Sequence, residues 1–441
     1  MSRHQLSRRT VVQAGTAAAG LAMLQATSPA AAQDEVVITF WNSTLPTEDP
    51  NDLTKPLEDF YIYQAIARFE EANPGIKVEI ETFPGGEELF TKYRTASVAQ
   101  NGPSVMGTWS GTYMLQFMDF LEPMGPHYTA DERAQLTGWE VVNPDFDPDS
   151  PDIYGVPAGS DGVTAFFYNK RLLGDAGLDP EQDWPADIDA FFTYLDTLAG
   201  SGVTPLTLGE NAIIWQVLLY WIGQTVGGAP GIGALASGER NFSDPELVNI
   251  IQRWQGLYDY TVPGAETMMG SEAAQLFAGE EAAMTTGLFG SIDDMRGFFG
   301  EDLGMVKLPN FSADAPLLDG GIGGAGVAFI VSNYDPNVDA AVSFVKFLMS
   351  PAELELRAQS GEGHLVNLAG IDAAALYDDP FKITQQEWAN EPSTIFWPDN
   401  IFDVELTTEI KAQSQLAWTS EISAEEFAAL IDAKRDEVLG Q

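Results

Sequence analysis

A strand, a helix and a second strand follow one another within residues 35–81. The run EVVITFW at 35–41 is continuous and β-branched, as is typical of a strand that is buried on both faces of a sheet. The apolar residues of 60–73 recur at helical spacing, and the run NPG at 73–75 ends the helix. Residues 76–81 alternate as IKVEIE, which predicts a strand with one apolar face. This order of elements indicates α/β architecture.

Helix signals recur along the rest of the chain. Pro245, Pro336 and Pro351 each follow an aspartate or a serine, the arrangement expected in the first turn of a helix. Ser423 and Glu426 have the spacing of a capping box ahead of a C-terminal helix. The chain has 441 residues, of which 45% are hydrophobic. A chain of this length exceeds what one hydrophobic core usually supports, so we expect two lobes.

The stretch DGGIGGAG at 319–326 contains the spacing GxGxxG, which in other proteins binds the pyrophosphate of a dinucleotide. That function needs a helix that begins directly after the glycines. Here the glycines precede VAFIVSN at 327–333, which is a strand pattern. We therefore expect no dinucleotide, and we interpret the glycines as a crossing between lobes, where the chain needs unusual dihedrals or a close backbone approach.

The first 32 residues have the pattern of an export signal. A basic start leads to a short alanine-rich apolar run and then to Ala-Ala-Ala at 30–32, so we expect cleavage before Gln33. SRRTVV at 7–12 resembles the twin-arginine motif, and an ordinary Sec signal with paired arginines is the alternative. The chain has no cysteine, which excludes disulfides and the lipid-bearing cysteine of a lipoprotein. We expect a soluble periplasmic protein without a membrane anchor.

Removal of this signal leaves 18 basic and 65 acidic residues, a net charge of −47. Such a charge excludes nucleic acid as a partner and disfavours anionic membranes and phosphate-bearing ligands. Strong acidity without low complexity is typical of salt-adapted secreted proteins. We therefore expect added salt to stabilise the fold.

Three longer stretches share the pattern of one protein family. They are YGVPAGSDGVTAFFYNKRLLGDAGLDP at 154–180, LFAGEEAAMTTGLFGS at 276–291 and GGIGGAGVAFIVSNYDPNVDAAVSFVKFLMSPAELELRAQSGEGHLVN at 320–367. Together they resemble the bacterial extracellular solute-binding proteins of family 1, the maltose-binding-protein-like sugar-binding subunits of ABC importers. The turn GHLV at 363–366 and the strand end TGLFG at 286–290 depart from the family pattern, which leaves the identity of the sugar open.

The resemblance implies a two-lobe periplasmic binding protein fold of type II, in which helices flank a mostly parallel sheet in each lobe. From it we expect an N-terminal lobe of residues 33–159 with 318–362, and a C-terminal lobe of residues 160–317 with 363–441. Hinge crossings would join the lobes and let them close around a ligand. The resemblance further implies that a monomer captures a neutral carbohydrate, either a mono- or oligosaccharide or a related polyol, and delivers it to ABC permease subunits without any cofactor.

The ligand site of such a fold is expected beyond the carboxyl ends of the strands. Sugar hydroxyls bond to carboxylates, amides and backbone groups, while the C–H faces of the sugar dock on aromatic rings. Candidate residues of these kinds follow strand patterns, lie at the expected crossings, or stand in segments that the resemblance places around the cleft. They are Trp41, Asn42, Trp109, Ser110, Asp161, Trp215, Phe289, Gly323 and Trp397.

Each of these candidates also has a structural interpretation. Trp215 lies inside the apolar run IIWQVLLYWIG, which fits a packed helix as well as it fits a ligand site. The resemblance implies that a carboxylate near Asp161 accepts sugar hydroxyls, but an aspartate in so acidic a chain is also expected in solvated turns. His364 stands in a turn that approaches the ligand in the family, and we leave it out of the site because a lone histidine is more often structural.

A secreted carbohydrate-active enzyme with paired carboxylates is the alternative function. Glu280 with Glu281, or Asp293 with Asp294, would be such a pair, although catalysis depends on a spatial separation that the sequence does not show. Two histidines remain beyond the export signal, and the chain has no cysteine and no HExxH motif. Zinc-dependent hydrolysis and thiol chemistry are therefore excluded.

The acidic run DFDPDSPD at 145–152 has a spacing similar to that of a calcium loop. However, Ser150 stands where an EF-hand needs glycine, and Val156 occupies the twelfth position in place of glutamate. We therefore interpret the run as an acidic surface loop and expect no metal site.

Overall fold

The computed structural model describes residues 35–49, 52–209 and 214–440. The predicted export signal at 1–32 lies outside the described residues. Within Val36–Gln441, which forms one unit, most strands gather in two sheets. Across the described ranges, none of the helices is long and apolar enough to cross a membrane.

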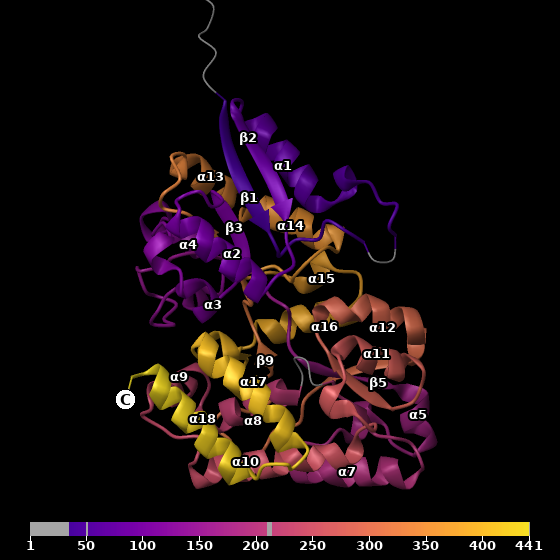
Figure 1. The fold of residues 1–441 in the computed structure, drawn as a ribbon. Helices are drawn as coiled ribbons and strands as arrows, with labels where there is room; N and C mark the ends of the chain where they lie inside the picture. Colours follow the sequence, from indigo (N-terminus) through magenta and orange to yellow (C-terminus); the bar gives the residue numbers. More distant parts are fainter. Residues whose placement is uncertain (1–34, 50–51, 210–213, 441) are drawn as a thin grey trace, which may run out of the picture. The chain divides into compact units, whose positions relative to one another are not determined.

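The first sheet contains five strands in the order β2-β1-β3-β10-β4. Their bounds are Val36–Asn42 (β1), Ile76–Thr82 (β2), Val105–Trp109 (β3), Val156–Gly159 (β4) and Val327–Val331 (β10). β1 pairs in parallel with β2 and β3, whereas β10 pairs antiparallel with β3 and β4. The predicted unit of strand, helix and strand is confirmed, because helix α1 (Tyr61–Ala72) lies between β1 and β2 in the chain and packs beside them (Figure 1).

The second sheet contains four strands in the order β6-β7-β5-β8. Their bounds are Ala165–Asn169 (β5), Leu206–Thr207 (β6), Met284–Gly287 (β7) and Leu303–Lys307 (β8). β5 pairs antiparallel with both β7 and β8, and only the short pair β6 and β7 is parallel within this sheet. A separate parallel pair joins β9 (Ile322–Gly323) to β11 (Ile395–Phe396).

The α/β class is confirmed, but the sheets are mixed where we expected mostly parallel sheets. β5 and β10 are buried along their whole length, although each pairs antiparallel with both of its neighbours. Continuous burial reflects cover on both faces of a strand and does not encode its direction. The direction depends on the end at which the chain enters the sheet, and both strands come directly after a crossing between the sheets.

Helices cover both sheets (Figure 1). We call the first sheet with its helices the first lobe; these helices are α1, α2 (Glu87–Val98), α3 (Thr112–Leu115), α4 (Ala130–Arg133), α13 (Val338–Leu348) and α14 (Pro351–Ser360). The second lobe is the second sheet with α5 (Lys170–Asp175), α6 (Pro180–Asp183), α7 (Ile188–Gly200), α8 (Ile214–Val226), α9 (Ala229–Ser237), α10 (Pro245–Gln255), α11 (Gly270–Ala278), α12 (Ile292–Phe299), α15 (Ala373–Leu376), α16 (Pro380–Ala389), α17 (Val404–Trp418) and α18 (Ala424–Val438).

The predicted helix starts are largely confirmed. α10 begins at Pro245 and α14 begins at Pro351, as the proline signals indicate. The capping box of Ser423 and Glu426 is formed at the start of α18. α13 begins at Val338, two residues later than the proline before it, because that proline lies in the preceding turn.

The chain crosses from the first sheet to the second at residues 160–164 and returns at 308–326. The two crossings lie side by side, and Val163 forms a bridge with Gly323. A Cβ atom on Gly321 would collide with the side chain of Val163, and one on Gly323 would collide with the backbone of the first crossing. The GxGxxG glycines therefore permit a close backbone approach, and the segment after them is a strand, as predicted.

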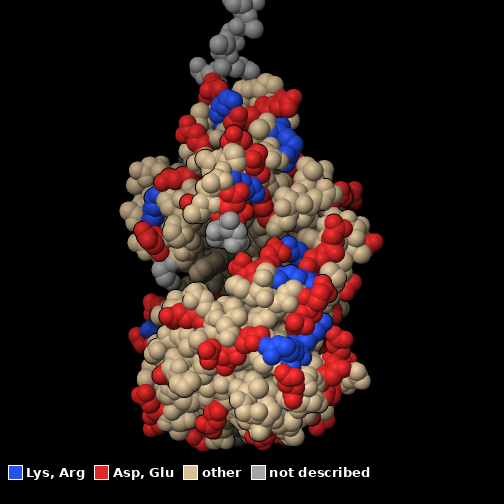
Figure 2. All heavy atoms as spheres, turned by 90° about the vertical axis from the view of Figure 1, so that its right-hand side faces the viewer, with Lys and Arg blue, Asp and Glu red and all other residues tan. Residues whose placement is uncertain are grey.

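Acidic side chains are spread over the whole face shown in Figure 2, with lysine and arginine residues between them. Some of the basic side chains form close ion pairs, such as Lys55 with Glu362 and Arg68 with Glu353, each at 2.6 Å. Because acidic residues outnumber basic residues by 65 to 21, most acidic side chains have no basic residue to pair with. This distribution agrees with a solvating role for the acidic residues.

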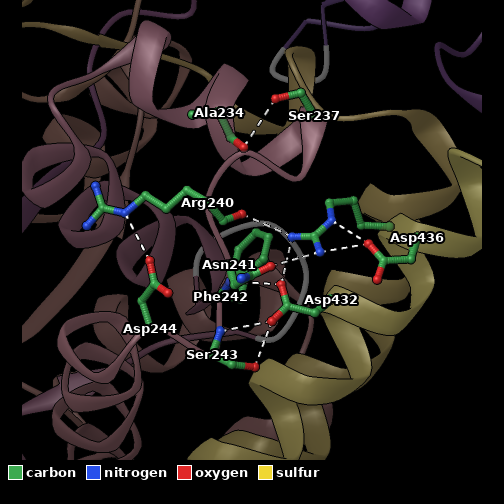
Figure 3. Close-up of polar contacts among 10 residues, drawn as sticks. Ala234, Ser237, Arg240, Asn241, Phe242, Ser243, Asp244, Asp432 and Asp436 are labelled. Atoms are coloured by element: carbon green, nitrogen blue, oxygen red, sulfur yellow. Dashed lines mark hydrogen bonds and ion pairs between the residues drawn. The ribbon is translucent and has the colours of Figure 1, made fainter. Parts of the chain in front are cut away.

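Polar contacts fasten the C-terminal helix α18 to the segment before α10 (Figure 3). The carboxylate of Asp432 accepts hydrogen bonds from the backbone N–H groups of Phe242 at 2.8 Å and Ser243 at 3.0 Å. Arg435 is 3% exposed and donates to the backbone oxygen of Arg240 at 3.1 Å and to Asp432 at 2.9 Å. The helix is therefore held by charged groups that are themselves largely removed from water.

Candidate ligand-binding site

A cavity of about 250 Å³ lies where the end of β3, both crossings and helices α8 and α17 meet. We call it the inner cavity. Four of the predicted site residues come together there: Trp109, Asp161, Trp215 and Trp397. The rest of the lining consists of Tyr113, Gln216, Leu288, Gly326, Asp399, Asn400 and Lys411.

Three indole rings of the inner cavity come from distant segments of the chain. Trp109 ends β3, is 38% exposed and meets the ring of Tyr113 edge-on, with 5.0 Å between the ring centroids. Trp215 lies in the first turn of α8, and Trp397 follows β11; both are nearly buried. Rings that are held in place by packing offer rigid apolar area to a ligand.

Asp399 is the most deeply buried carboxylate of the inner cavity, at 8% exposure. Its Oδ2 accepts a hydrogen bond from the hydroxyl of Tyr113 at 3.4 Å, and Lys411 Nζ lies 3.4 Å from the same hydroxyl. Burial raises the pKa of Asp399 to about 6, although the positive charge of Lys411 acts in the opposite direction. Lys411 Nζ also lies 4.6 Å from the centroid of the Trp215 ring, so this lysine lies between the Asp399–Tyr113 pair and an aromatic ring of the cavity.

Two buried polar atoms of this cavity have no hydrogen-bond partner among the described residues. They are Nε1 of Trp397, which can only donate, and Oδ1 of Asp399, which accepts when the group is ionised. A buried polar group without a partner costs about 1–3 kcal/mol. A ligand hydroxyl both donates and accepts, so a polyhydroxylated ligand would satisfy both atoms.

Asp161 lies in the first crossing and presents its two carboxylate oxygens to different neighbours. Oδ1 lies 3.0 Å from Nε2 of His364. Oδ2 lies so near Gly326 that a Cβ atom on this glycine would collide with it, and Trp397 Nε1 lies next to the same position. The third glycine of the GxGxxG stretch therefore leaves room for a carboxylate and an indole N–H in the inner cavity.

A second cavity of about 630 Å³ shares Asp161 with the inner cavity. We call it the outer cavity. It contains the predicted site residue Phe289 together with His364, which the sequence analysis set aside. Its other lining residues are Ser43, Thr44, Leu45, Pro46, Thr47, Glu48, Thr82, Phe83, Pro84, Gly290 and Gly363.

Ser110, another predicted site residue, is not part of the lining of the inner cavity and joins the two lobes. It is buried, its hydroxyl donates to the backbone oxygen of Ala325 at 2.7 Å, and Asn400 Nδ2 lies 3.1 Å from it. Nearby, the hydroxyl of Thr112 donates to the backbone oxygen of Phe402 at 2.7 Å. These contacts bring the end of β3 against the segment that follows β11.

Three other predicted residues are not brought to the inner cavity. Trp41 lines a separate cavity beside α2, where Lys92 Nζ lies 4.4 Å from the centroid of its ring. Asn42 is fully buried and shapes a turn, since its Oδ1 accepts from Leu45 N at 2.9 Å. Gly323 lines another separate cavity and permits the close approach of the two crossings.

Some lining residues of the inner cavity were missed by the sequence analysis. Gln216 is the polar residue inside the apolar run IIWQVLLYWIG, and Asp399 and Asn400 directly follow Trp397 in the run WPDN. Both patterns could have indicated these residues as site candidates, because a polar group within or just beyond an apolar element needs a hydrogen-bond partner. Lys411 carried no such signal, because lysine is common on the exposed faces of helices.

The predicted catalytic pairs lie elsewhere. Glu280 forms an ion pair with Arg171, and Asp293 forms one with Lys382 at 2.8 Å. Neither pair belongs to the lining of the inner or the outer cavity. Within the described part of the chain, no three or more His, Cys, Asp or Glu side chains are arranged to hold a metal ion.

Residues 54–355 match the family of bacterial extracellular solute-binding proteins. The chain belongs to this family. An uncharacterised ABC transporter extracellular-binding protein of Pyrococcus horikoshii is 25% identical over 269 residues, which cover 55% of this chain. The match spans 58% of that relative's own length.

Solved structures of solute-binding proteins have the same two-lobe fold. A chitin oligosaccharide binding protein has a TM-score of 0.76 and 17% identity, with 93% of this chain and 100% of that chain covered. The GacH receptor of Streptomyces glaucescens has a TM-score of 0.69 and 19% identity, with 92% and 99% covered. A family 1 extracellular solute-binding protein from Bifidobacterium longum subsp. infantis has a TM-score of 0.69 and 18% identity, with 91% and 99% covered. The predicted two-lobe α/β fold is thereby confirmed.

Proposed function

We propose that this solute-binding protein is the periplasmic substrate-binding component of an ABC importer, and that it captures a neutral carbohydrate and delivers it to a membrane permease. The observation that carries the proposal is the inner cavity, where three indole rings surround two carboxylates, two amides and an unpartnered indole N–H. Such a mixture suits the apolar faces and the hydroxyls of a sugar ring. Similar folds named for a chitin oligosaccharide, for acarbose and for β-D-galactopyranose support a carbohydrate ligand.

The charge of the inner cavity favours a neutral ligand. Asp161 and Asp399 line it together with a single cationic residue, Lys411, among the described lining residues. An anionic ligand would meet two carboxylates inside and a surface that carries a large excess of acidic groups. A neutral polyol avoids this repulsion and still offers hydroxyls to both carboxylates.

The proposed affinity is in the micromolar range, which needs about −8 kcal/mol of binding free energy. Each aromatic ring that stacks on the sugar contributes about 0.5–1.5 kcal/mol beyond its buried area. Each hydrogen bond to a charged group contributes about 1.5–3 kcal/mol. Rings, carboxylates and apolar area must therefore act together, since no single group reaches the required value.

We propose that ligand binding is coupled to closure of the two lobes. The proposed lobe boundaries are 33–159 with 318–362 for the first lobe, and 160–317 with 363–441 for the second. Trp109 comes from the first lobe and Trp397 from the second, so a ligand between them makes contacts that exist only when the lobes meet. Such contacts shift the population toward the closed form, which we propose docks on the permease as a monomer.

A sugar panel tests this function directly. The exported protein is titrated with neutral mono- and oligosaccharides while tryptophan fluorescence and thermal unfolding are followed, and each sugar is recovered and checked by chromatography. We expect at least one sugar to change the fluorescence, to raise the unfolding temperature and to remain intact. No response to any sugar would overturn the proposal, whereas hydrolysis would favour an enzyme that uses Asp161 and Asp399 as its carboxylates.

A further inference from the structure

We infer that the ligand is a linear carbohydrate of at least two sugar units, with one ring in the inner cavity and the next unit in the outer cavity. This inference rests on the proposed carbohydrate function and adds the length of the ligand and its path through the site. It is carried by the sizes of the two cavities, by the wall that they share and by the different chemistry of their linings.

The inner cavity is small for a complete ligand site. Its volume of about 250 Å³ lies below the range of about 300–1,000 Å³ that is usual for small-molecule pockets. The outer cavity adds about 630 Å³ directly beyond Asp161. The inner cavity therefore suits one ring, while the two cavities together suit a longer chain.

The two cavities share one wall. Asp161 lines both of them, and the wall continues without interruption from Leu288 in the inner cavity to Phe289 and Gly290 in the outer cavity. A hydrogen bond of 3.0 Å from the backbone N–H of Phe289 to the backbone oxygen of Asp161 holds the two parts of this wall together. The linings of the two cavities therefore meet at Asp161 and at residues 288–290.

The linings indicate different tasks. The inner cavity presents indole rings and buried, unpartnered polar atoms, which recognise one particular ring with strict geometry. The outer cavity is lined by serine and threonine side chains with two phenylalanine rings. A hydroxyl oxygen still accepts when its proton is donated, as that of Ser43 is to the backbone oxygen of Gly107 at 2.7 Å, so this lining can accept hydrogen bonds from the hydroxyls of further sugar units, directly or through water.

Asp161 lies where the bond between the two sugar units would pass. Its Oδ1 is held by His364, which lines the outer cavity, while its Oδ2 faces Gly326 in the inner cavity. One carboxylate therefore has an oxygen on each side of the boundary. We assign Asp161 to the hydroxyls next to the linkage and His364 to the positioning of that carboxylate.

Gly290 offers a way to block the outer cavity alone. A Cβ atom at this position meets no atom within 4 Å, and its backbone has an ordinary negative φ, so a large side chain can be accommodated. Gly290→Trp would add an indole to the lining of the outer cavity. Gly297→Trp is the matched control, because Gly297 is equally open, lies in α12 and lines neither cavity.

The experiment compares calorimetric titrations of the wild type and both variants with glucose, maltose and maltotriose, and with the corresponding xylose and N-acetylglucosamine series. In the series that binds, we expect the dimer or trimer to bind at least tenfold more tightly than the monomer. We expect Gly290→Trp to abolish this gain, while Gly297→Trp keeps it. Gly290→Gln serves as a smaller block if thermal unfolding shows that the tryptophan variant is not folded.

Each outcome is decisive. A monomer that binds as tightly as its oligomers would overturn the inference and leave the proposed function intact. A gain with length that persists in Gly290→Trp and in Gly290→Gln would overturn the placement in the outer cavity. Failure of every sugar to bind the wild type would overturn the proposed function, and the inference with it.

Discussion

Oδ1 of Asp161 lies 3.0 Å from Nε2 of His364, so a carboxylate of the first crossing is paired with an imidazole from the turn after α14. Both residues lie in segments that connect the lobes and not in the sheets. The boundary between the inner and the outer cavity is therefore built from segments that would move in the proposed closure of the lobes.

Replacement of Asp161 by alanine should weaken sugar binding about tenfold to a hundredfold. The variant loses a hydrogen bond to a charged group, which is worth about 1.5–3 kcal/mol. Titration calorimetry with the best sugar of the panel measures the change. Asp131→Ala is the control, since Asp131 is exposed in the first turn of α4. Equal affinities of wild type and Asp161→Ala would contradict the site.

Trp109→Ala should weaken binding by a similar factor and should reduce the fluorescence response to sugar. Trp109 is 38% exposed and lines the inner cavity, so its loss removes ring surface that is available to the ligand. Phe298→Ala is the control, because Phe298 is an exposed aromatic residue of α12 outside both cavities. The two variants should unfold within a few degrees of the wild type; a large loss of stability in Trp109→Ala alone would show a packing role.

Asp399 should make the stability of the protein depend on pH between about 4 and 6. Burial raises the pKa of Asp399 to about 6, above the value near 4 of an aspartate in an unfolded chain. In this window the folded state keeps a proton that the unfolded state has lost, so the contribution of Asp399 to the free energy of unfolding falls as the pH rises. Asp399→Asn removes this titration.

We therefore expect Asp399→Asn to gain stability relative to the wild type as the pH rises from 4 to 7, by about 1–3 kcal/mol. Urea unfolding of both proteins at the two pH values measures the change. Asp131→Asn should show no such dependence, because Asp131 is exposed. If the free energies of unfolding of Asp399→Asn and the wild type differ by the same amount at pH 4 and at pH 7, burial does not raise the pKa of Asp399.

Asp432→Ala should lower the free energy of unfolding by about 2–3 kcal/mol, because it removes the acceptor of two backbone N–H groups and the less exposed of the two carboxylates that pair with the buried Arg435. Asp436→Ala is the matched control within Figure 3, since Asp436 pairs with the same arginine from a half-exposed position. We expect the control to lose less than about 1 kcal/mol. Equal losses in urea unfolding would contradict the anchoring role of Asp432.

Added salt should raise the unfolding temperature. Screening shortens the range of charge interactions to about 8 Å at 0.15 M ionic strength, which weakens the mutual repulsion of a chain with 65 acidic and 21 basic residues. Thermal unfolding between 0.02 and about 0.3 M NaCl measures the effect, and KCl should act equally, because screening depends on ionic strength. An unfolding temperature that does not rise would contradict net repulsion as a destabilising factor.

Local physical chemistry made several features predictable. The strand at 35–41, the helix after it and the capping box of Ser423 with Glu426 depend on side-chain periodicity and on hydrogen bonds between near neighbours. The lack of a helix after the GxGxxG glycines was equally predictable, because the β-branched run directly after them favours a strand. The choice of Asp161 and of several aromatic residues as site candidates depended on the family resemblance, which places their segments around the cleft.

Tertiary structure alone decided which of these residues meet. Ser110 and Asn400 are 290 residues apart and bond to each other, whereas Trp41, near the end of a neighbouring strand in the same sheet, lines a separate cavity beside α2. The direction of β5 and β10 was decided in the same way, by the crossings that precede them. The sequence by itself therefore determined the elements and the kind of chemistry. Assembly of the inner cavity depended on contacts between distant segments, whose free energy is not encoded in any local pattern.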